Sequence, residues 1–298
     1  MFKIRKIKDK LSLKIILIIA ISFNLLLIVN FILLSVKSEK IFESNSLFSL
    51  LLGGNWQPLG GEFGLKYFIA GTLFVTFLSI MLAAPLGILC SIFLAEYAPK
   101  KISVLSKSII DIFAGIPSVV YGIWGVICIV PAVAGVAHKL FGLNITGYSL
   151  LSASVVLSIM IFPIITNIVI ELIEFVPQEL REVSYSLGAT RWQTVKHVVI
   201  RKIYPGIIAA IILGLSRAFG ETMAVMMVAG NVAAMPRNVF DPVYTLSALI
   251  ANNYGEMMSI PLYDSAVMFV SLVLLVTVVL FNSIARIIIH RIMKNGIK

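Results

Sequence analysis

Residues 176–192 read VPQELREVSYSLGATRW, and they form a polar segment between two long apolar stretches of the chain. Pro177 suits the first position of a helix, and Gly188 suits the residue just past a helix end. About three turns of helix are therefore predicted between these two residues.

The predicted helix carries one apolar stripe, because Leu180, Val183 and Leu187 recur at helical spacing. A second helix is expected to start directly after the glycine. Thr190 is a candidate N-cap, and Gln193 stands three residues later as its capping-box partner. The segment therefore predicts a helix, a glycine corner and another helix, with an exposed stripe that suits docking into the groove of a partner.

The apolar stretches around this segment indicate an all-α membrane protein. Of 298 residues, 59% are hydrophobic and 13% are charged, and the mean hydropathy is +1.03. This composition excludes a soluble enzyme, a disordered chain and a disulfide-stapled secreted module, and leaves a channel, a transporter part or a membrane-embedded enzyme. A bilayer span needs about 20 apolar residues. Six stretches reach that length: 15–36, 68–94, 109–134, 148–170, 205–227 and 266–284.

The placement of basic residues orients these spans. If the N-terminus, the loop between the second and third spans, the 171–203 loop and the C-terminus share one side, 18 of the 24 Lys and Arg residues lie on that side. Both termini are therefore predicted to be cytoplasmic, in a multi-pass protein of a prokaryotic inner membrane. The net charge of +10 then needs no nucleic-acid partner.

The chain is expected to form one transmembrane unit with short appendages, since it shows no internal repeat. The predicted parts are a basic cytoplasmic N-terminus (1–14), a first transmembrane anchor (15–36), an external loop (37–66), a transmembrane domain (67–285) that contains the helical loop at 171–203, and a basic cytoplasmic tail (286–298).

The fifth span contains a charged pair. Residues 214–225 read GLSRAFGETMAV, which places Arg217 and Glu221 four residues apart and hence on one helix face, near mid-membrane. A guanidinium is a fork of donors that fits tetrahedral oxyanions, so the pair suits an anion path. An internal salt bridge between helices is the alternative. A ridge of small residues is expected to pack this helix closely, formed by Gly206, Ala210, Gly214 and Ala218.

The third span is predicted to be broken. Residues 114–125 read AGIPSVVYGIWG, in which Pro117 interrupts the helix and Gly115 and Gly122 loosen it. Broken spans are tolerated where they line a cavity, so this span is a candidate wall of the path, with a packing kink as the alternative.

The loop resembles the EAA loop in membrane subunits of ATP-binding-cassette (ABC) importers. The resemblance rests on Glu182-Val-Ser, Gly188 and the Ala-Thr-Arg-Trp that follows, although Val183 and Ser184 stand where alanines are usual and Arg201 where the pattern ends in proline. It implies that the loop docks in a cleft of an ATPase subunit. The residues implied in this coupling are Glu179, Glu182, Ser184, Leu187, Gly188, Ala189 and Arg191.

Together with this loop, the third-span and fifth-span motifs resemble permeases of the phosphate-specific ABC importer, the Pst system. The features at 55–58, 63–64, 71–72 and 117–122 are more similar to the PstC type than to the PstA type. The resemblance implies a type I importer (MetI-like) fold, a PstA-like second permease, two PstB-like ATPase subunits and an external PstS-like phosphate-binding protein. The implied substrate path contains Arg217, Glu221, Thr222 and Ser118.

The sequence contains no Gly-x4-Gly-Lys-Ser/Thr motif, so the chain is expected to be no enzyme and to bind no cofactor itself, with ATP and Mg used by a partner ATPase. No catalytic or metal site is expected, because His138, His197 and His290 are scattered. Two alternatives stay open. A permease for another oxyanion, such as sulfate or molybdate, would keep the loop, whereas a passive anion channel would not need it.

Overall fold

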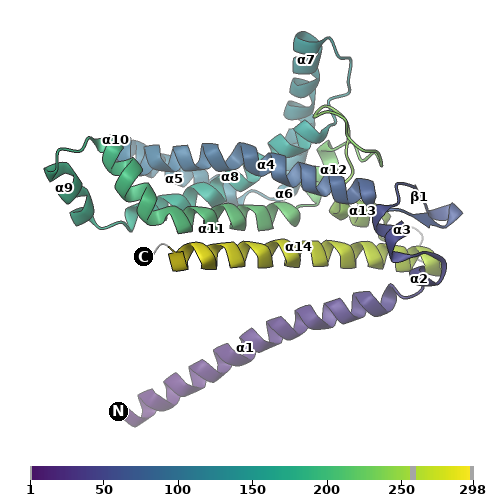
Figure 1. Ribbon diagram of the computed structural model, residues 1–298, viewed down its shortest axis with the longest axis horizontal. Coiled ribbons are helices and arrows are strands. Elements are labelled where there is room, and N and C mark those ends of the chain that lie inside the picture. Colours follow the sequence, from purple (N-terminus) through teal and green to yellow (C-terminus); the bar gives the residue numbers. More distant parts are fainter. Residues whose placement is uncertain (1, 256–259, 296–298) are drawn as a thin grey trace.

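The computed structural model describes residues 2–255 and 260–295, so Met1 and residues 296–298 of the predicted termini lie outside it. The described chain is almost entirely helical (Figure 1). Six helical stretches are long and apolar enough to cross a membrane, as the sequence predicts: Ser12–Lys37, Lys66–Tyr97, Ser118–Phe141, Leu150–Glu174, Arg191–Phe219 and Leu262–Arg291.

Three helices form the centre of the molecule: α4 (Lys66–Ile92), α8 (Leu150–Glu174) and α11 (Ile200–Phe219). Small polar residues allow α4 and α8 to approach closely. Ser91 of α4 is fully buried, and its hydroxyl donates to the carbonyl oxygens of Gly87, at 2.6 Å, and Thr166 of α8, at 2.9 Å. A short π-helical turn, η2 (Phe93–Tyr97), ends α4.

The third apolar stretch is not one helix, so the predicted span 109–134 is wrong in its bounds. It is divided into α5 (Lys100–Gly115), α6 (Ser118–Trp124), a π-helical turn η3 (Gly125–Ile129) and α7 (Val130–Phe141). Figure 1 shows α5 beside α4 and α8, whereas α7 stands crosswise to them. The break lies between Gly115 and Ser118, because Ile116 and Pro117 have extended backbones.

The fifth stretch also differs from the predicted single span 205–227. Helix begins earlier, with α10 (Arg191–Thr194) and η4 (Val195–Val199) leading directly into α11. It then stops at Phe219 and resumes as α12 (Met223–Val228). Pro205 therefore lies inside α11 and does not begin the helix.

The end opposite α9 (Gln178–Ser186) is a small separate core. It combines α2 (Ile41–Ser44), α3 (Leu47–Leu52), the antiparallel pair β1 (Trp56–Gln57) and β2 (Glu62–Phe63) around η1 (Pro58–Gly60), and α13 (Leu246–Asn253) with the start of α14 (Pro261–Asn295). Phe68 and Leu246 are fully buried there. This core joins the 37–66 loop to the membrane helices.

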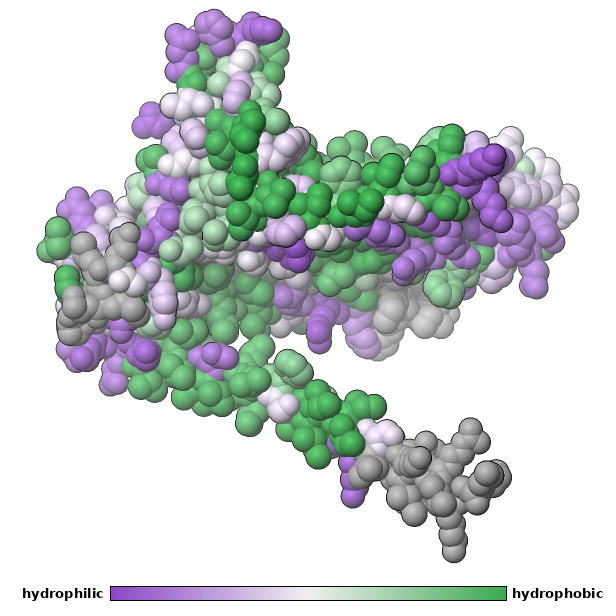
Figure 2. Space-filling view, turned by 180° about the vertical axis from the view of Figure 1, so that it is seen from behind, coloured by the Kyte–Doolittle hydropathy of each residue, from purple (hydrophilic) through white to green (hydrophobic). Residues whose placement is uncertain are grey.

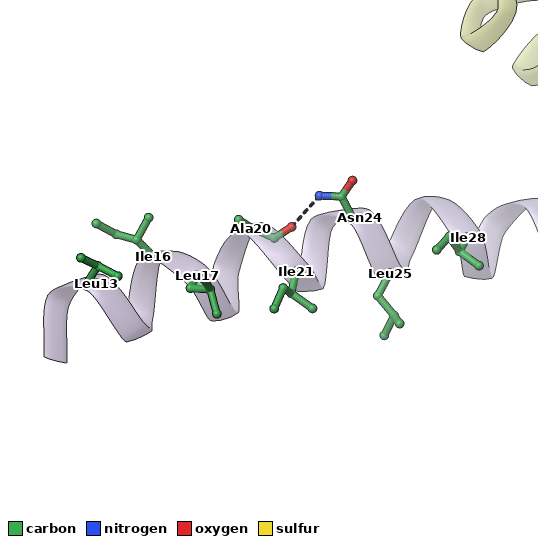
Figure 3. A pocket seen from close by; sticks show the side chains of 8 residues that line it. All are labelled: Leu13, Ile16, Leu17, Ala20, Ile21, Asn24, Leu25 and Ile28. Carbon is green, nitrogen blue, oxygen red and sulfur yellow. Dashed lines mark hydrogen bonds between the residues drawn. The ribbon is translucent and has the colours of Figure 1, made fainter. Parts of the chain in front are cut away.

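Helix α1 (Phe2–Lys37) contacts α14 but diverges from it towards the N-terminus (Figure 1). Its side chains from Leu13 to Ile28 line an open apolar hollow, where the Asn24 amide donates back to the Ala20 carbonyl at 2.8 Å (Figure 3). Figure 2 shows hydrophobic residues along α1 and over the long helices. This is the surface expected of helices in contact with lipid.

Candidate functional site: a helical loop and two broken helices

Helix α9 and the corner after it are built as the sequence predicts. Pro177 directly precedes the helix, and Gly188 follows it with φ +82°, a left-handed conformation that glycine adopts without strain. The capping box is present. The Thr190 hydroxyl accepts from the backbone N–H of Gln193 at 3.3 Å, and the side-chain oxygen of Gln193 accepts from the backbone N–H of Thr190 at 2.8 Å. The two helices of the loop are therefore held at a fixed corner.

The apolar stripe of α9 is left largely uncovered by the residues that the structure describes. Leu180, Val183 and Leu187 are 39%, 59% and 83% exposed, and Glu179 and Glu182 are exposed beside them. An apolar stripe rimmed by charged residues is typical of a contact surface for another protein.

The other face of α9 is fastened to the membrane helices by Arg181. Its guanidinium donates to the Glu96 carboxylate of η2 through Nε at 3.2 Å and Nη2 at 2.9 Å, and to the carbonyl oxygens of Val176, at 2.5 Å, and Ile173, at 2.8 Å. Only 11% of the Arg181 side chain and 7% of the Glu96 side chain are exposed. One side chain therefore joins α9 to the ends of both α4 and α8.

Two further contacts stabilise the loop. The Ser184 and Thr194 hydroxyls are 2.8 Å apart, and the Arg191 guanidinium lies 4.9 Å from the centre of the Tyr97 ring. Of the predicted coupling residues, the structure thus places Ser184 and Arg191 in internal contacts and half-buries Ala189. It leaves Glu179, Glu182, Leu187 and Gly188 exposed.

Arg217 and Glu221 do not share a helix face, contrary to the sequence prediction. Arg217 lies in the last turn of α11, and Glu221 lies in the break before α12, where its carboxylate accepts from the Ala224 N–H at 3.2 Å. Within the described residues the ion pairs are Lys107 with Glu174 and Arg181 with Glu96, so the two charges are not bonded to each other. Arg217 is also near the end of its span and not at its middle, because α11 follows directly on helix that begins at Arg191.

The predicted ridge of small residues does pack α11 against α8. A Cβ on Gly206 would lie 2.6 Å from Leu172, and one on Gly214 would lie 3.1 Å from Ile165. Ala210 and Ala218 are buried on the same face. Arg217 itself is exposed.

The two helix breaks lie together. Ser118 begins α6 after the break at Pro117, Thr222 precedes α12 after the break at Gly220, and α6 packs on α12. The sequence predicts that Gly122 belongs to the helix break, but this residue lies inside α6. A Cβ at this position would lie 2.5 Å from the Met227 sulfur. The Tyr121 hydroxyl of α6 donates across the break at Pro117 to the Phe113 carbonyl of α5 at 2.8 Å.

This arrangement resembles the sites of membrane transporters in one general respect. Discontinuous helices expose backbone groups and helix ends at a place where an ion can bind. Four polar residues lie at or beside the two breaks: Ser118, Arg217, Glu221 and Thr222.

Sequence reasoning missed Glu96, Arg181 and Tyr121 as parts of the site. Glu96 and Arg181 are 85 positions apart. For Glu96 and Arg181, the one available signal was a charge close to the end of an apolar stretch.

The described chain is a bundle of membrane helices whose exposed helical loop is fixed to two of its spans. The model of the family described as "Binding-protein-dependent transport system inner membrane component" matches residues 87–294. The chain belongs to this family.

Curated relatives are similar over most of their length. The probable ABC transporter permease protein YqgH of Bacillus subtilis is 40% identical, with 86% of this chain and 82% of the relative covered. The phosphate transport system permease protein PstC of Mesorhizobium japonicum is 36% identical, with 82% and 79% covered. The probable PstC of Methanocaldococcus jannaschii is 36% identical, with 76% of each chain covered.

Solved structures share the fold. The MetNI methionine ABC transporter in an inward-facing conformation matches with a TM-score of 0.60 at 23% identity, covering 80% of this chain and 99% of that chain. A bacterial alginate ABC transporter matches with a TM-score of 0.58 at 17% identity, covering 76% and 79%. The predicted MetI-like, type I importer fold is confirmed, and the chain is a multi-pass inner membrane protein.

Proposed function

We propose that this chain is the PstC-type permease of an ABC importer that carries inorganic phosphate across the cytoplasmic membrane. The relatives named as phosphate permeases support the substrate, and an exposed guanidinium at the two helix breaks suits a tetrahedral oxyanion. The observation that carries the proposal is helix α9, whose outer stripe is uncovered while its inner face is fastened to α4 and α8.

The uncovered stripe is the docking surface for the ATPase. A complete importer would contain a PstA-like second permease, two PstB-like ATPase subunits that use ATP and Mg, and a PstS-like binding protein outside. Docking residues are Glu179, Glu182, Leu187 and Gly188, which are exposed. Ser184, Ala189 and Arg191 act by keeping the loop in shape.

The transport cycle uses alternating access. Closure of the ATPase moves α9, and the Arg181 contacts pass this movement to the ends of α4 and α8. The spans then rock, phosphate from the binding protein passes Arg217, and hydrolysis resets the gate. Glu221 and Thr222 at one break and Ser118 at the other complete the passage.

The loop lies on the cytoplasmic side together with both termini. In Figure 1, α9 and the N and C marks lie at one end of the molecule, and the hairpin of β1 and β2 lies at the other. The excess of Lys and Arg in the same segments supports this orientation.

The test is uptake of labelled phosphate by the reconstituted importer, with ATP inside the vesicles and with sulfate or molybdate as competitor. We expect uptake that needs ATP and ignores both competitors. ATP-dependent uptake of sulfate or molybdate would replace the substrate but keep the importer. Uptake that proceeds without ATP or the ATPase would instead indicate a passive anion channel and overturn the proposal.

A further inference from the structure

Helix α5, which packs on the spanning helix α8, has a polar face. Lys107, Asp111 and Gly115 follow one another at intervals of four residues, and Ser108 lies beside them. Ile102, Leu105 and Ile109 lie on the opposite side and are exposed. Helix α5 therefore presents one apolar side and one side that we call the polar strip: Lys107, Ser108, Asp111 and Gly115.

The polar strip continues onto α8 through two side-chain pairs. The Lys107 ammonium donates to the Glu174 carboxylate at 2.5 Å, and the Asn167 amide donates to the Asp111 carboxylate at 2.7 Å. Asn167 lies seven residues before the end of α8 at Glu174, which places the second pair about 10 Å further into the span. The two pairs therefore join α5 to α8 at two different depths.

The strip is open along its length. Ser108 and Asp111 are exposed, and no atom lies within 4 Å of the position that a Cβ on Gly115 would occupy. An intramembrane carboxylate that faces lipid costs several kcal/mol, so such residues normally face water or a protein. Within the described residues Asp111 accepts a single hydrogen bond, from Asn167, although a carboxylate has about four acceptor positions. A dry interface would leave the other positions unsatisfied, whereas water would fill them.

We propose that the polar strip of α5, with Asn167 and Glu174 of α8, is the wall of the water-filled inner half of the passage, between the helix breaks and the end that carries α9. This inference rests on the proposed function, because the ion it serves is the transported oxyanion. Lys107 and Asn167 supply donors for that ion, and Asp111 and Glu174 hold these donors in place. The two carboxylates also keep binding of an anion weak, which favours its release.

The first test is the accessibility of cysteines in the complete importer in vesicles. Ser108→Cys is compared with Ile109→Cys, which is the next residue, lies at nearly the same depth on the apolar side and is 45% exposed. Both are made with Cys90→Ala and Cys128→Ala, and co-purification of the partner subunits checks assembly. A charged, membrane-impermeant methanethiosulfonate is expected to modify Ser108→Cys at least about tenfold faster, because the reactive thiolate forms in water and not in lipid. Equal rates, whether slow or fast, would overturn the water-filled strip.

The second test asks whether the polar strip interacts with the transported ion, which is a separate question from whether the strip faces water. Lys107→Gln is expected to lower the rate of phosphate uptake at least about threefold, because a donor for the oxyanion is lost. Lys139→Gln, an exposed lysine in the last turn of α7 and hence off the strip, is the matched control. Equal uptake by the two variants would overturn the role of Lys107. If the parent importer carries no phosphate at all, the proposed function fails, while the cysteine experiment still decides whether the strip faces water.

Discussion

Arg181 is the residue that fixes the position of α9 relative to the membrane helices. It is buried against Glu96 and two backbone carbonyls, so all of its main contacts are with groups outside α9. A buried ion pair adds little net stability compared with a well-packed apolar pair, but loss of one partner leaves a buried charge without compensation. The pair therefore fixes position more than it adds stability.

We expect Arg181→Met to destabilise the subunit by about 3–5 kcal/mol, because Glu96 remains buried without its partner. The double variant Glu96→Gln with Arg181→Met should recover a large part of this loss. The midpoint of thermal unfolding of the purified importer measures both effects. If the destabilisation of the double variant equals the sum of the destabilisations caused by Arg181→Met alone and by Glu96→Gln alone, the two residues are not coupled as the structure indicates.

At the same scale, we expect Arg217→Lys to reduce phosphate uptake about tenfold although the charge is kept, because lysine lacks the planar fork that binds two oxygens at once. Arg237→Lys, an exposed position in the outer loop, is the control and should transport normally. Uptake at the parental rate by Arg217→Lys would assign the residue a structural role only.

At the scale of the elements, hydropathy and end signals predicted most of the fold. Pro177, Gly188 and the capping box of Thr190 marked the loop helices correctly, because those signals act within a few residues. The break after Phe219 was missed, since Gly-Glu-Thr contains no proline and lies between two apolar runs. Its stability comes from contacts with other elements, such as the Ser247 hydroxyl of the α13 helix that donates to the Glu221 carbonyl at 3.0 Å.

The contact between α6 and α12 leads to a prediction about Gly122. Gly122→Ala should destabilise the subunit, because the new methyl group would lie 2.5 Å from the Met227 sulfur and 3.2 Å from the Ala224 Cα, which is backbone. Overpacking of this kind costs about 1–3 kcal/mol. Gly135→Ala in α7 meets no atom within 4 Å and should be neutral or slightly stabilising. Equal midpoints of thermal unfolding for the two variants would contradict the close packing.

At the scale of the whole molecule, the opposite ends of the bundle face different compartments. Leu59 is exposed in the hairpin turn between β1 and β2, and Leu187 is exposed at the end of α9. In cells whose native Cys90 and Cys128 are replaced by alanine, an impermeant thiol reagent should label Leu59→Cys in intact cells but Leu187→Cys only after the membrane is opened. Labelling of Leu187→Cys in intact cells would reverse the orientation.

The uncovered stripe of α9 also affects the life of the subunit in the cell. In the proposed importer, a newly made copy that has not bound the ATPase would display Leu180, Val183 and Leu187 to the cytoplasm, and such surfaces are recognised by chaperones and proteases. We expect orphan copies to be degraded, so that the amount of permease follows the amount of ATPase. A pulse-chase measurement in cells that lack the ATPase should show a shortened half-life, and replacing the three residues with serine should lengthen it.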